Sequence, residues 1–344
     1  DSMTNTHINR RHFLKAGALG TLGLAAGATA LGQGGRAVAQ EGDNPEAHAG
    51  HSGIAMPGFV GEVDHVANGF NPTDILVDFN WGDRVSIDSG GRTLREYDLF
   101  ASDKDVEVAP GIIFPAWTYN GRIPGPTLRA REGDRLQINF VNASAHPHTI
   151  HFHGIHPGNM DGVYEVVAPG QRFTYAFDAE PFGVHLYHCH VMPLAKHIAK
   201  GLYGAFIIDP AGGWPPAGRE LVMVMAGNDI DFDGGNDFYN VNFIPFHYDR
   251  HPIQVKTGEL VRVFLVNVLE YDLLNSFHLH ANLFHWYPTG TSLTASEFTD
   301  TLILGQAQRG LLEFRYKYPG KYMFHAHVTE FAELGWTGVI EVTD

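Results

Sequence analysis

Short segments in which apolar and polar residues alternate run through most of the chain and are separated by turn residues. Within 135–142, for example, Leu136, Ile138 and Phe140 alternate with polar side chains. A two-residue period predicts a strand with one face on a core. No long stretch carries the 3.6-residue apolar period of an amphipathic helix. With 40 Gly and 19 Pro to supply turns, the pattern predicts an all-β protein.

The chain contains one such unit twice. Residues 133–142 are a Gly-led turn followed by a strand, and residues 258–267 repeat both features. Each copy is followed by two His-x-His motifs, and a Gly stands five residues before the second motif in both copies. We predict two Greek-key β-barrel or sandwich domains, 65–210 and 218–344, joined by a Pro/Gly-rich linker at 211–217.

The N-terminal region predicts an export signal at 1–39. Paired arginines at 10–11 precede a weakly apolar Gly/Ala-rich stretch at 16–31, and small residues at 37–39 offer a cleavage site. These features resemble a twin-arginine signal, and the stretch is too short and Gly-rich for a stable membrane span. We expect a periplasmic or extracellular protein with a flexible tail at 40–64.

Composition narrows the function classes. The 344 residues suffice for two domains, and a formal net charge of −15 argues against nucleic acid as a partner. The one Cys cannot form an internal disulfide, so a disulfide scaffold is excluded. The 21 His are unevenly spread, and many gather in the four His-x-His motifs.

Each His-x-His motif predicts two imidazoles on one side of a strand, because residues i and i+2 share a face. Four pairs at matching places in two repeats are hard to explain as surface decoration. Buried imidazoles without partners cost free energy, which a shared metal cluster would offset. The eight candidate ligands are His151, His153, His188, His190, His278, His280, His325 and His327.

Cys189 lies between His188 and His190 and therefore faces the opposite side of the strand. A thiolate with two imidazoles and a weak axial group is the arrangement of a blue-copper site. His148 and His197 can supply the imidazoles, and Leu202 stands where an axial group would approach.

The second repeat lacks these ligands. Ala326 stands at the position of Cys189, and Asn275 stands three residues before His278, as His148 stands three before His151. We therefore predict no blue copper in the second domain.

These segments resemble the two-domain multicopper oxidases, also called two-domain or small laccases, over roughly residues 110–344. The motifs that carry the likeness are His151-Phe152-His153-Gly154, His188-Cys189-His190, His278-Leu279-His280, His325-Ala326-His327 and the turn at 119–126. Blue copper in the first domain alone is similar to the subtype named type B. The resemblance implies cupredoxin-like domains. It also implies a type 1 copper bound by His148, Cys189 and His197, with Leu202 as a non-coordinating axial residue. The eight paired histidines would hold a trinuclear type 2/type 3 cluster, which gives four coppers per chain.

The resemblance also implies partners and assembly. Phenolic or aromatic amine donors would give single electrons, with an exposed edge of His197 as the point of entry, and O2 would be reduced to water. Family members of this length form homotrimers in which the cluster lies between the first domain of one subunit and the second domain of the next. No nucleic acid and no membrane span are expected.

Two acidic positions are candidates for proton transfer at the cluster. Asp161 matches the family's acidic residue, with a turn-capping role as the alternative. Glu330 follows His327 closely, with a solvated surface role as the alternative, and Glu333 competes with it, since spacing does not choose between them.

Three rival functions remain. A copper nitrite reductase also has two such domains, but that family carries Asp at the position of His151 and no His at the position of His190. A metal-ion oxidase for Cu(I) is weakened by the presence of only seven Met, and one for Fe(II) needs carboxylates near His197 that the local sequence does not show. A copper carrier would leave the eight paired histidines unexplained.

The histidines outside the pairs are expected to pack or hydrogen-bond rather than bind metal: His146, His156, His185, His247, His251 and His285.

Overall fold

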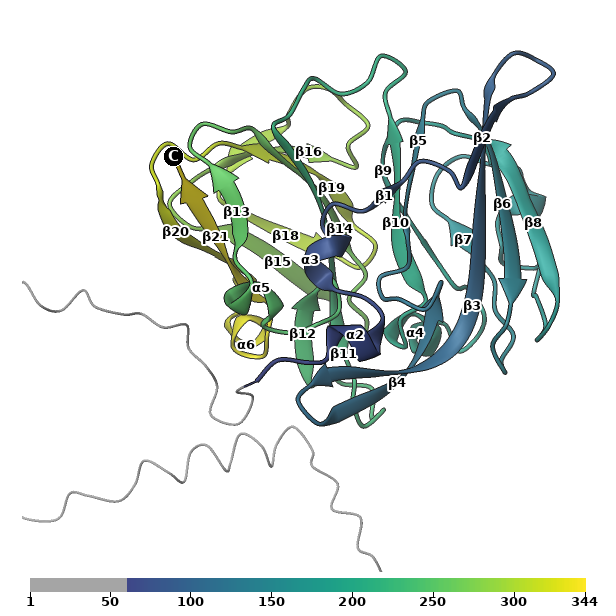
Figure 1. The fold of residues 1–344 in the computed structure, drawn as a ribbon, viewed down its shortest axis with the longest axis horizontal. Coiled ribbons are helices and arrows are strands. Elements are labelled where there is room, and N and C mark those ends of the chain that lie inside the picture. The colour runs from purple at the N-terminus through teal and green to yellow at the C-terminus, as the bar shows by residue number, and fades with distance from the viewer. Residues whose placement is uncertain (1–60) are drawn as a thin grey trace, which may run out of the picture. The chain divides into compact units, whose positions relative to one another are not determined.

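The computed structural model describes residues 61–344, and the predictions made for 1–39 and for 40–60 lie outside this part of the chain (Figure 1). As predicted, the described body is all-β, and its longest helix has six residues. The helices are α2 (His65–Asn68), α3 (Pro72–Ile75), η1 (Gly158–Met160), α4 (Leu194–Ala199), α5 (His247–Arg250) and α6 (Thr329–Glu333). Among the described residues, no helix has the length and apolar character needed to cross a membrane.

The first half of the body consists of two sheets. Sheet 1 has the order β2-β3-β6-β8, with β4 paired to β3, and contains β2 (Arg84–Ile87), β3 (Thr93–Ala109), β4 (Ile112–Tyr119), β6 (Arg135–Asn142) and β8 (Arg172–Asp178). Sheet 2 has the order β1-β5-β10-β9-β7 and contains β1 (Phe79–Asn80), β5 (Thr127–Arg131), β7 (His151–Phe152), β9 (Gly183–His188) and β10 (Tyr203–Asp209).

The second half repeats this arrangement. Sheet 3 has the order β12-β11-β14-β19-β16-β17 and contains β11 (Arg219–Asn228), β12 (Phe238–Val241), β14 (Val261–Asn267), β16 (Phe284–Pro288), β17 (Glu297–Thr299) and β19 (Arg309–Phe314). Sheet 4 has the order β13-β21-β20-β15-β18 and contains β13 (Ile253–Lys256), β15 (Leu274–Leu279), β18 (Thr301–Gly305), β20 (Gly320–His325) and β21 (Thr337–Thr343).

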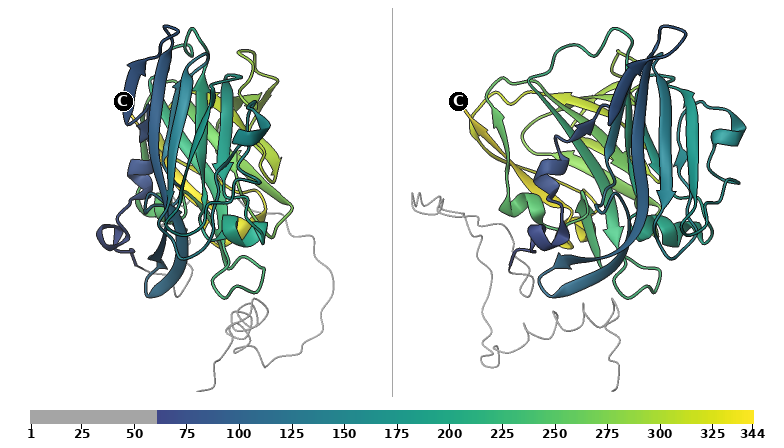
Figure 2. Two further views of the ribbon diagram at one scale, coloured as in Figure 1. Left: turned by 90° about the vertical axis from the view of Figure 1, so that its right-hand side faces the viewer. Right: turned by 45° about the vertical axis from the view of Figure 1, so that its right-hand side comes forward.

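The four sheets stack in the order 1, 2, 3, 4, which runs from right to left in Figure 1. Three apolar cores separate them. The core between sheets 1 and 2 contains Phe140 and Phe206, the core between sheets 2 and 3 contains Ile207 and Phe264, and the core between sheets 3 and 4 contains, among others, Leu265. The β3–β4 hairpin extends beyond sheet 1 and contributes to the middle core (Figure 2).

The two copies of the repeated strand differ in burial. The strand β6 alternates, with Leu136, Ile138 and Phe140 buried and the intervening residues partly exposed, as predicted. The strand β14 was predicted to alternate too, but all seven of its residues are buried. The reason is position: sheet 3 has a core on both faces, whereas sheet 1 has a core on one face only.

The start of the described chain is more firmly packed than the predicted tail at 40–64 implies. Val63 is 4% exposed within the middle core. The Asp64 carboxylate accepts hydrogen bonds from the backbone N–H groups of Val66 and Ala67 and so caps α2. Residues 61–64 therefore belong to the folded body.

Candidate metal centres

The predicted blue-copper ligands meet in one buried site, named here the Cys189 site (His148, Cys189 and His197). The Cys189 Sγ lies 3.3 Å from His197 Nδ1 and 3.8 Å from His148 Nδ1, and the two Nδ1 atoms are 3.3 Å apart. Their exposed fractions are 0%, 0% and 4%. Three donor atoms of the two kinds that favour copper thus converge in an apolar setting.

Three separate segments position this site. His148 lies just before β7 and forms an isolated bridge with Val167, Cys189 follows the end of β9, and α4 carries His197. The second ring nitrogen of His148, Nε2, is 3.0 Å from the hydroxyl of Ser144, which leaves Nδ1 directed at the sulfur. Sequence reasoning missed Ser144.

Burial sets the protonation of these ligands. It lowers the pKa of His148 to about 3 and that of His197 to about 4, so both imidazoles are neutral near pH 7 and able to bind a metal. Burial also raises the pKa of the Cys189 thiol. A metal ion bound there would displace the thiol proton.

Leu202 is fully buried in the same core as Cys189, and its carbonyl accepts a hydrogen bond from the Cys189 N–H at 3.0 Å. The backbones of Leu202 and Cys189 are thus paired, which is compatible with the axial prediction. Its axial role remains a prediction.

The corresponding place in the second domain is filled by apolar groups. Ala326 donates its N–H to the carbonyl of Trp336 at 3.1 Å, which matches the pairing of Cys189 with Leu202. Trp336 in turn donates to Phe331, as Leu202 donates to His197. Asn275, Ala326, Phe331 and Trp336 are all buried, and none of them offers a thiolate or imidazole. The absence of blue copper from the second domain stays a prediction.

The first-domain pairs form one group, the first quartet (His151, His153, His188 and His190). Ring centroids lie 5.1 Å apart within the first pair and 5.9 Å within the second, so each pair projects to one side as predicted. The Nε2 atoms of His153 and His188 are 3.2 Å apart. Two ligands of one tetrahedral ion would be separated by about 3.3 Å.

The second-domain pairs form an equivalent group, the second quartet (His278, His280, His325 and His327). The centroid distances within its pairs are 5.0 Å and 5.9 Å, and the Nε2 atoms of His280 and His325 are 2.9 Å apart. In two histidines of each quartet, Nδ1 lies within hydrogen-bond distance of a main-chain carbonyl, which leaves Nε2 free to bind a metal. The pairs are His151 with Asp161, His188 with Cys189, His278 with Asp300 and His325 with Ala326.

The two quartets face different spaces within one chain. Phe152 and Cys189 belong to the core between sheets 1 and 2, so the first quartet faces the other side of sheet 2. Phe277 and Phe324 belong to the core between sheets 3 and 4, so the second quartet faces outward from sheet 4. Sheets pack about 10 Å apart, which puts sheets 2 and 4 about 20 Å apart. The quartets therefore do not meet within one chain.

The predicted proton-transfer residues have different surroundings. Asp161 Oδ1 lies 3.2 Å from His151 Nδ1 and 3.7 Å from His156 Nε2, next to the first quartet. Glu330 lies in the first turn of α6 and is half-buried, whereas Glu333 at the end of that helix is exposed. A proton-relay role for any of them remains a prediction.

A pocket of about 540 Å³ adjoins the Cys189 site. The prediction that an edge of His197 is exposed overestimates its exposure, since only 4% of the residue is exposed. The Trp117 ring packs against the imidazole, with their ring centroids 4.7 Å apart. His197 still lines this pocket together with Trp117, Met192, Lys196 and two carboxylates that sequence reasoning missed, Asp103 and Asp105. They lie on β3, far from His197 in the sequence, so no local signal indicated them.

Most other histidines have the packing or hydrogen-bonding roles that were predicted. His185 Nε2 lies 2.9 Å from the Pro181 carbonyl and His156 Nε2 lies 2.8 Å from that of Phe152. The His146 ring packs against Trp117 and the His285 ring against Phe298, both in a tilted arrangement. His247 and His251 are described further below.

Two stacked Greek-key domains with a buried cysteine–histidine site and histidine quartets define a multidomain copper protein of the cupredoxin type. The family models of the multicopper oxidases match residues 102–212 and 216–344. The chain belongs to the multicopper oxidase family, in its two-domain form, and members of this family are copper-dependent oxidoreductases.

The known proteins to which the chain is similar have several different activities. A crystal structure of a multicopper oxidase is 62% identical, with a TM-score of 0.80, and the match covers 82% of this chain and 100% of that one. The copper nitrite reductase of Nitrosomonas europaea is 29% identical, with a TM-score of 0.68, over 73% of this chain and 94% of that one. Laccase-12 of Oryza sativa is 33% identical over 237 residues, 59% of this chain and 40% of that protein.

Nitrite reductases also occur among the sequence relatives. The copper-containing nitrite reductase of Neisseria meningitidis is 26% identical over 254 residues, 65% of this chain and 63% of that protein. The match spans 62–63% of the length of the Neisseria relatives, so family membership does not by itself assign their activity to this chain.

Proposed function

We propose that the protein is a laccase-like multicopper oxidase that oxidises phenolic or aromatic amine donors one electron at a time and reduces O2 to water. The observation that carries this proposal is the pair of histidine quartets at matching places in the two domains. A nitrite-reducing site in this family needs only three histidines, so a complete second quartet is better explained by O2 reduction.

The residues would hold four coppers per chain. The Cys189 site would hold the type 1 copper, and the two quartets would hold one type 2 and two type 3 coppers. Bound copper supplies one-electron redox chemistry and, in the cluster, the binding of O2. The protein contributes neutral, pre-oriented imidazoles and a direct covalent link between the two kinds of site, because Cys189 adjoins His188 and His190 in the chain.

Copper content with absorption and EPR spectra tests the assignment, run beside O2 uptake with a phenol, Fe(II) and nitrite. Four coppers per chain and O2 uptake with a phenol are expected. Two coppers per chain with nitrite turnover would reject the proposal in favour of a nitrite reductase.

We further propose a homotrimer in which the first quartet of one subunit and the second quartet of the next share a cluster. The opposite orientations of the two quartets support this, since one chain cannot bring them together. Both quartets also include partly exposed imidazoles, and His327 is exposed. A neighbouring subunit would cover these groups.

Co-expression of two inactive variants tests the shared cluster. His153→Ala damages the first quartet, and His280→Ala damages the second. If clusters form between subunits, about a quarter of the interfaces in random mixed trimers combine two intact quartets, and O2 uptake recovers to about that fraction. A cluster built within one chain would give no recovery, and an active, fully metallated monomer in native mass measurements would likewise reject the trimer.

The pocket beside His197 supports a second candidate, an Fe(II) oxidase. Asp103 and Asp105 supply the carboxylates that such an activity needs and that the local sequence does not show. Trp117 and Met192 give the same pocket an apolar wall suited to an aromatic donor.

The double variant Asp103→Asn/Asp105→Asn separates these donors. Loss of two negative charges is expected to lower kcat/KM about tenfold for Fe(II) and for cationic aromatic amines, and to leave a neutral phenol unaffected. An equal loss for all donors would indicate structural damage at the Cys189 site instead.

We also propose export by the twin-arginine route, on the strength of the paired arginines at 10–11. Replacing both with Lys is expected to retain the protein in the cytoplasm, measured by cell fractionation, and unchanged export would reject the proposal.

A further inference from the structure

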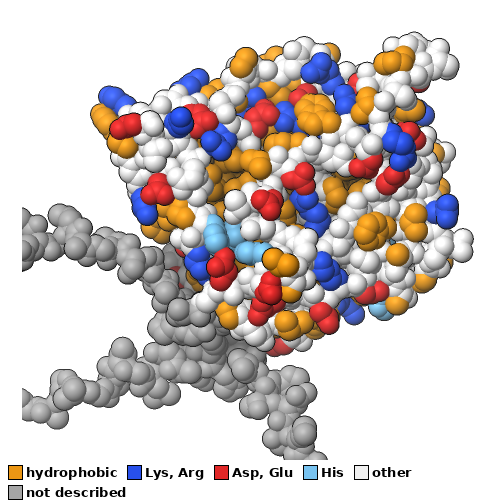
Figure 3. All heavy atoms as spheres, viewed as in Figure 1, with side chains coloured by type: hydrophobic (Ala, Val, Ile, Leu, Met, Phe, Trp, Pro, Cys, Tyr) orange, Lys and Arg blue, Asp and Glu red, His pale blue; other side chains and the backbone are white. Residues whose placement is uncertain are grey.

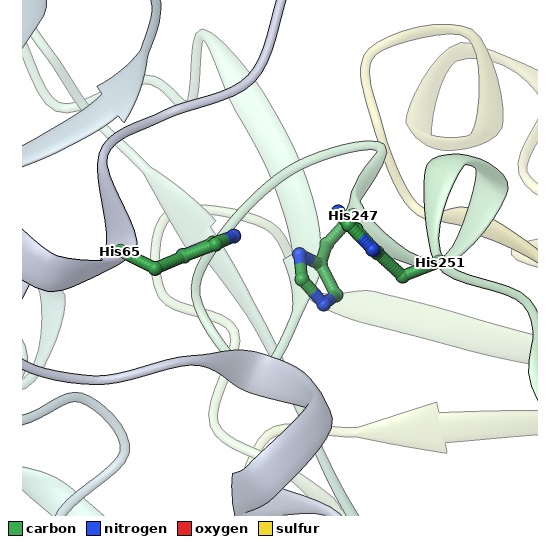
Figure 4. A group of neighbouring side chains, drawn as sticks. All are labelled: His65, His247 and His251. Carbon is green, nitrogen blue, oxygen red and sulfur yellow. The ribbon is translucent and has the colours of Figure 1, made fainter.

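A cluster of three histidines lies outside the sites described so far. His65 begins α2, at the start of the described chain, and His247 begins α5 in the second domain, with His251 capping the end of that helix. Figure 4 shows His65 approaching from one side and the other two from the opposite side. Histidine side chains are visible at the surface where α2 and α5 meet (Figure 3).

The geometry of this cluster is comparable to that of the copper sites. One ring nitrogen from each histidine lies within 4.8 Å of the other two. The ligand atoms of the Cys189 site, and those of three members of each quartet, are equally close to one another. The His247 and His251 rings stack at 4.5 Å, and the centroid of His65 is 5.0 Å from that of His247. His247 and His251 are four residues apart, a spacing that puts both on one side of a helical turn.

Several ring nitrogens here are buried without a hydrogen-bond partner. They are both nitrogens of His65, Nδ1 of His247 and Nε2 of His251. The other nitrogen of His247, Nε2, lies 2.8 Å from the hydroxyl of Thr73 on α3. If Nε2 donates its hydrogen to Thr73, the lone pair of Nδ1 is directed into the cluster, which is how a protein orients a metal-binding imidazole.

A carboxylate completes the set. Glu62 Oε1 lies 2.5 Å from His251 Nε2, outside hydrogen-bond geometry, and 3.9 Å from His65 Nε2. Burial lowers the pKa of His247 to about 2 and also lowers the pKa of His65, so both rings are neutral and able to bind a cation. The charge of Arg250 opposes a cation at this place, and the charges of Glu62 and Asp64 offset it.

We infer that Glu62, His65, His247 and His251 form a mononuclear site for Zn²⁺ or a comparable divalent transition ion, which fastens α2 to α5. Three imidazoles and one carboxylate are a donor set that suits a tetrahedral zinc ion and is unsuited to Mg²⁺ or Ca²⁺. The site joins the start of the described chain to the second domain, so the ion would act as a clamp. It gives a role to the buried nitrogens of His65 and to His247 Nδ1, which have no hydrogen-bond partner.

The test is zinc binding by the copper-loaded, full-length protein and its variants. After incubation with ZnCl2 and extensive dialysis, the unaltered protein is expected to retain one more divalent metal ion per chain than His65→Ala/His251→Ala, with zinc and copper both quantified by mass spectrometry. Zinc that binds elsewhere, including at the N-terminal histidines, is common to both proteins and cancels in the difference. An extra copper in place of zinc supports the site and identifies its ion.

Three further variants keep the test independent of folding. Thr73→Val removes the partner of His247 Nε2 and is expected to weaken zinc binding about 10- to 100-fold. The single change His251→Ala alters a partly exposed side chain and is expected to abolish retention. His285→Ala is the matched control, because it removes a histidine outside the cluster, and it should bind zinc as the unaltered protein does.

Thermal stability gives a second readout. Added zinc is expected to raise the Tm of the unaltered protein and of His285→Ala, and to leave that of the double variant unchanged. Equal metal content in the unaltered protein and the double variant, or equal Tm shifts, would overturn the inference and leave the cluster a packing arrangement.

Discussion

At the scale of single residues, Leu202 is the predicted axial neighbour of a type 1 copper in the Cys189 site. Leu202 is fully buried, its backbone is paired with that of Cys189, and its side chain offers no lone pair to a metal. A thioether at this position would bind weakly and stabilise the oxidised ion. Leu202→Met is therefore expected to lower the type 1 potential, by about 60 mV for a tenfold change in the one-electron equilibrium.

Redox titration of the blue absorption band measures this shift. Leu202→Ile, which remains apolar, should keep the potential of the unaltered protein. An unchanged or higher potential in Leu202→Met would remove Leu202 from the axial role.

A second residue-scale prediction concerns Glu270. Its burial raises the pKa of the carboxyl group from 4.5 to about 7. A carboxyl with a raised pKa binds its proton more tightly in the folded protein than in the unfolded one, so the free energy of unfolding falls as the pH rises through this window. Glu270→Gln is expected to raise the Tm at pH 8 and to make no difference below pH 4.5.

Scanning calorimetry across pH checks this expectation, with the exposed Glu297→Gln as the control. A stabilising effect of Glu270→Gln of equal size at every pH would contradict the titration argument.

At the scale of the elements, an ion-pair network joins sheets 2 and 3. Arg262 on β14 is 1% exposed and donates to Glu220 on β11 at 2.9 Å and to Glu313 on β19 at 2.5 Å. Glu220 also accepts from Arg129 on β5 at 2.6 Å, and Arg129 pairs with Asp209 on β10. The network thus crosses the boundary between the two domains.

Removing one member leaves buried charges without a partner. Arg262→Met is expected to lower the free energy of unfolding by about 3–5 kcal/mol, measured by chemical denaturation. The exposed Arg172→Met on β8 should change it by about 0.5 kcal/mol or less. A loss below about 1 kcal/mol for Arg262→Met would show that water or local rearrangement compensates the carboxylates.

At the scale of the whole molecule, the stacking of the sheets determines where the proposed O2 reduction could take place. The Cys189 site lies within one domain, whereas the proposed cluster needs two subunits. We therefore expect that dilution or mild denaturant that dissociates the trimer abolishes O2 uptake while the blue absorption band persists. Sedimentation analysis with parallel spectra measures this, and simultaneous loss of both signals would indicate unfolding instead.

Much of the site is determined by the sequence, because local geometry follows from chain spacing. Residues i and i+2 of a strand share a face, so each His-x-His motif defines a pair of imidazoles and puts Cys189 on the opposite side. The missing ligands at Asn275 and Ala326 are likewise evident from the repeat. The all-β fold follows from short alternating segments between turns.

The tertiary structure decided what depends on packing between distant segments. Only the stacking of four sheets shows that β14 is buried on both faces and that the two quartets face different spaces. It also places Asp103 and Asp105 in the pocket that His197 lines, fills the second-domain site with Phe331 and Trp336, and brings His65 close to His247 and His251. Such contacts depend on how whole sheets pack, which a local pattern of residues does not specify.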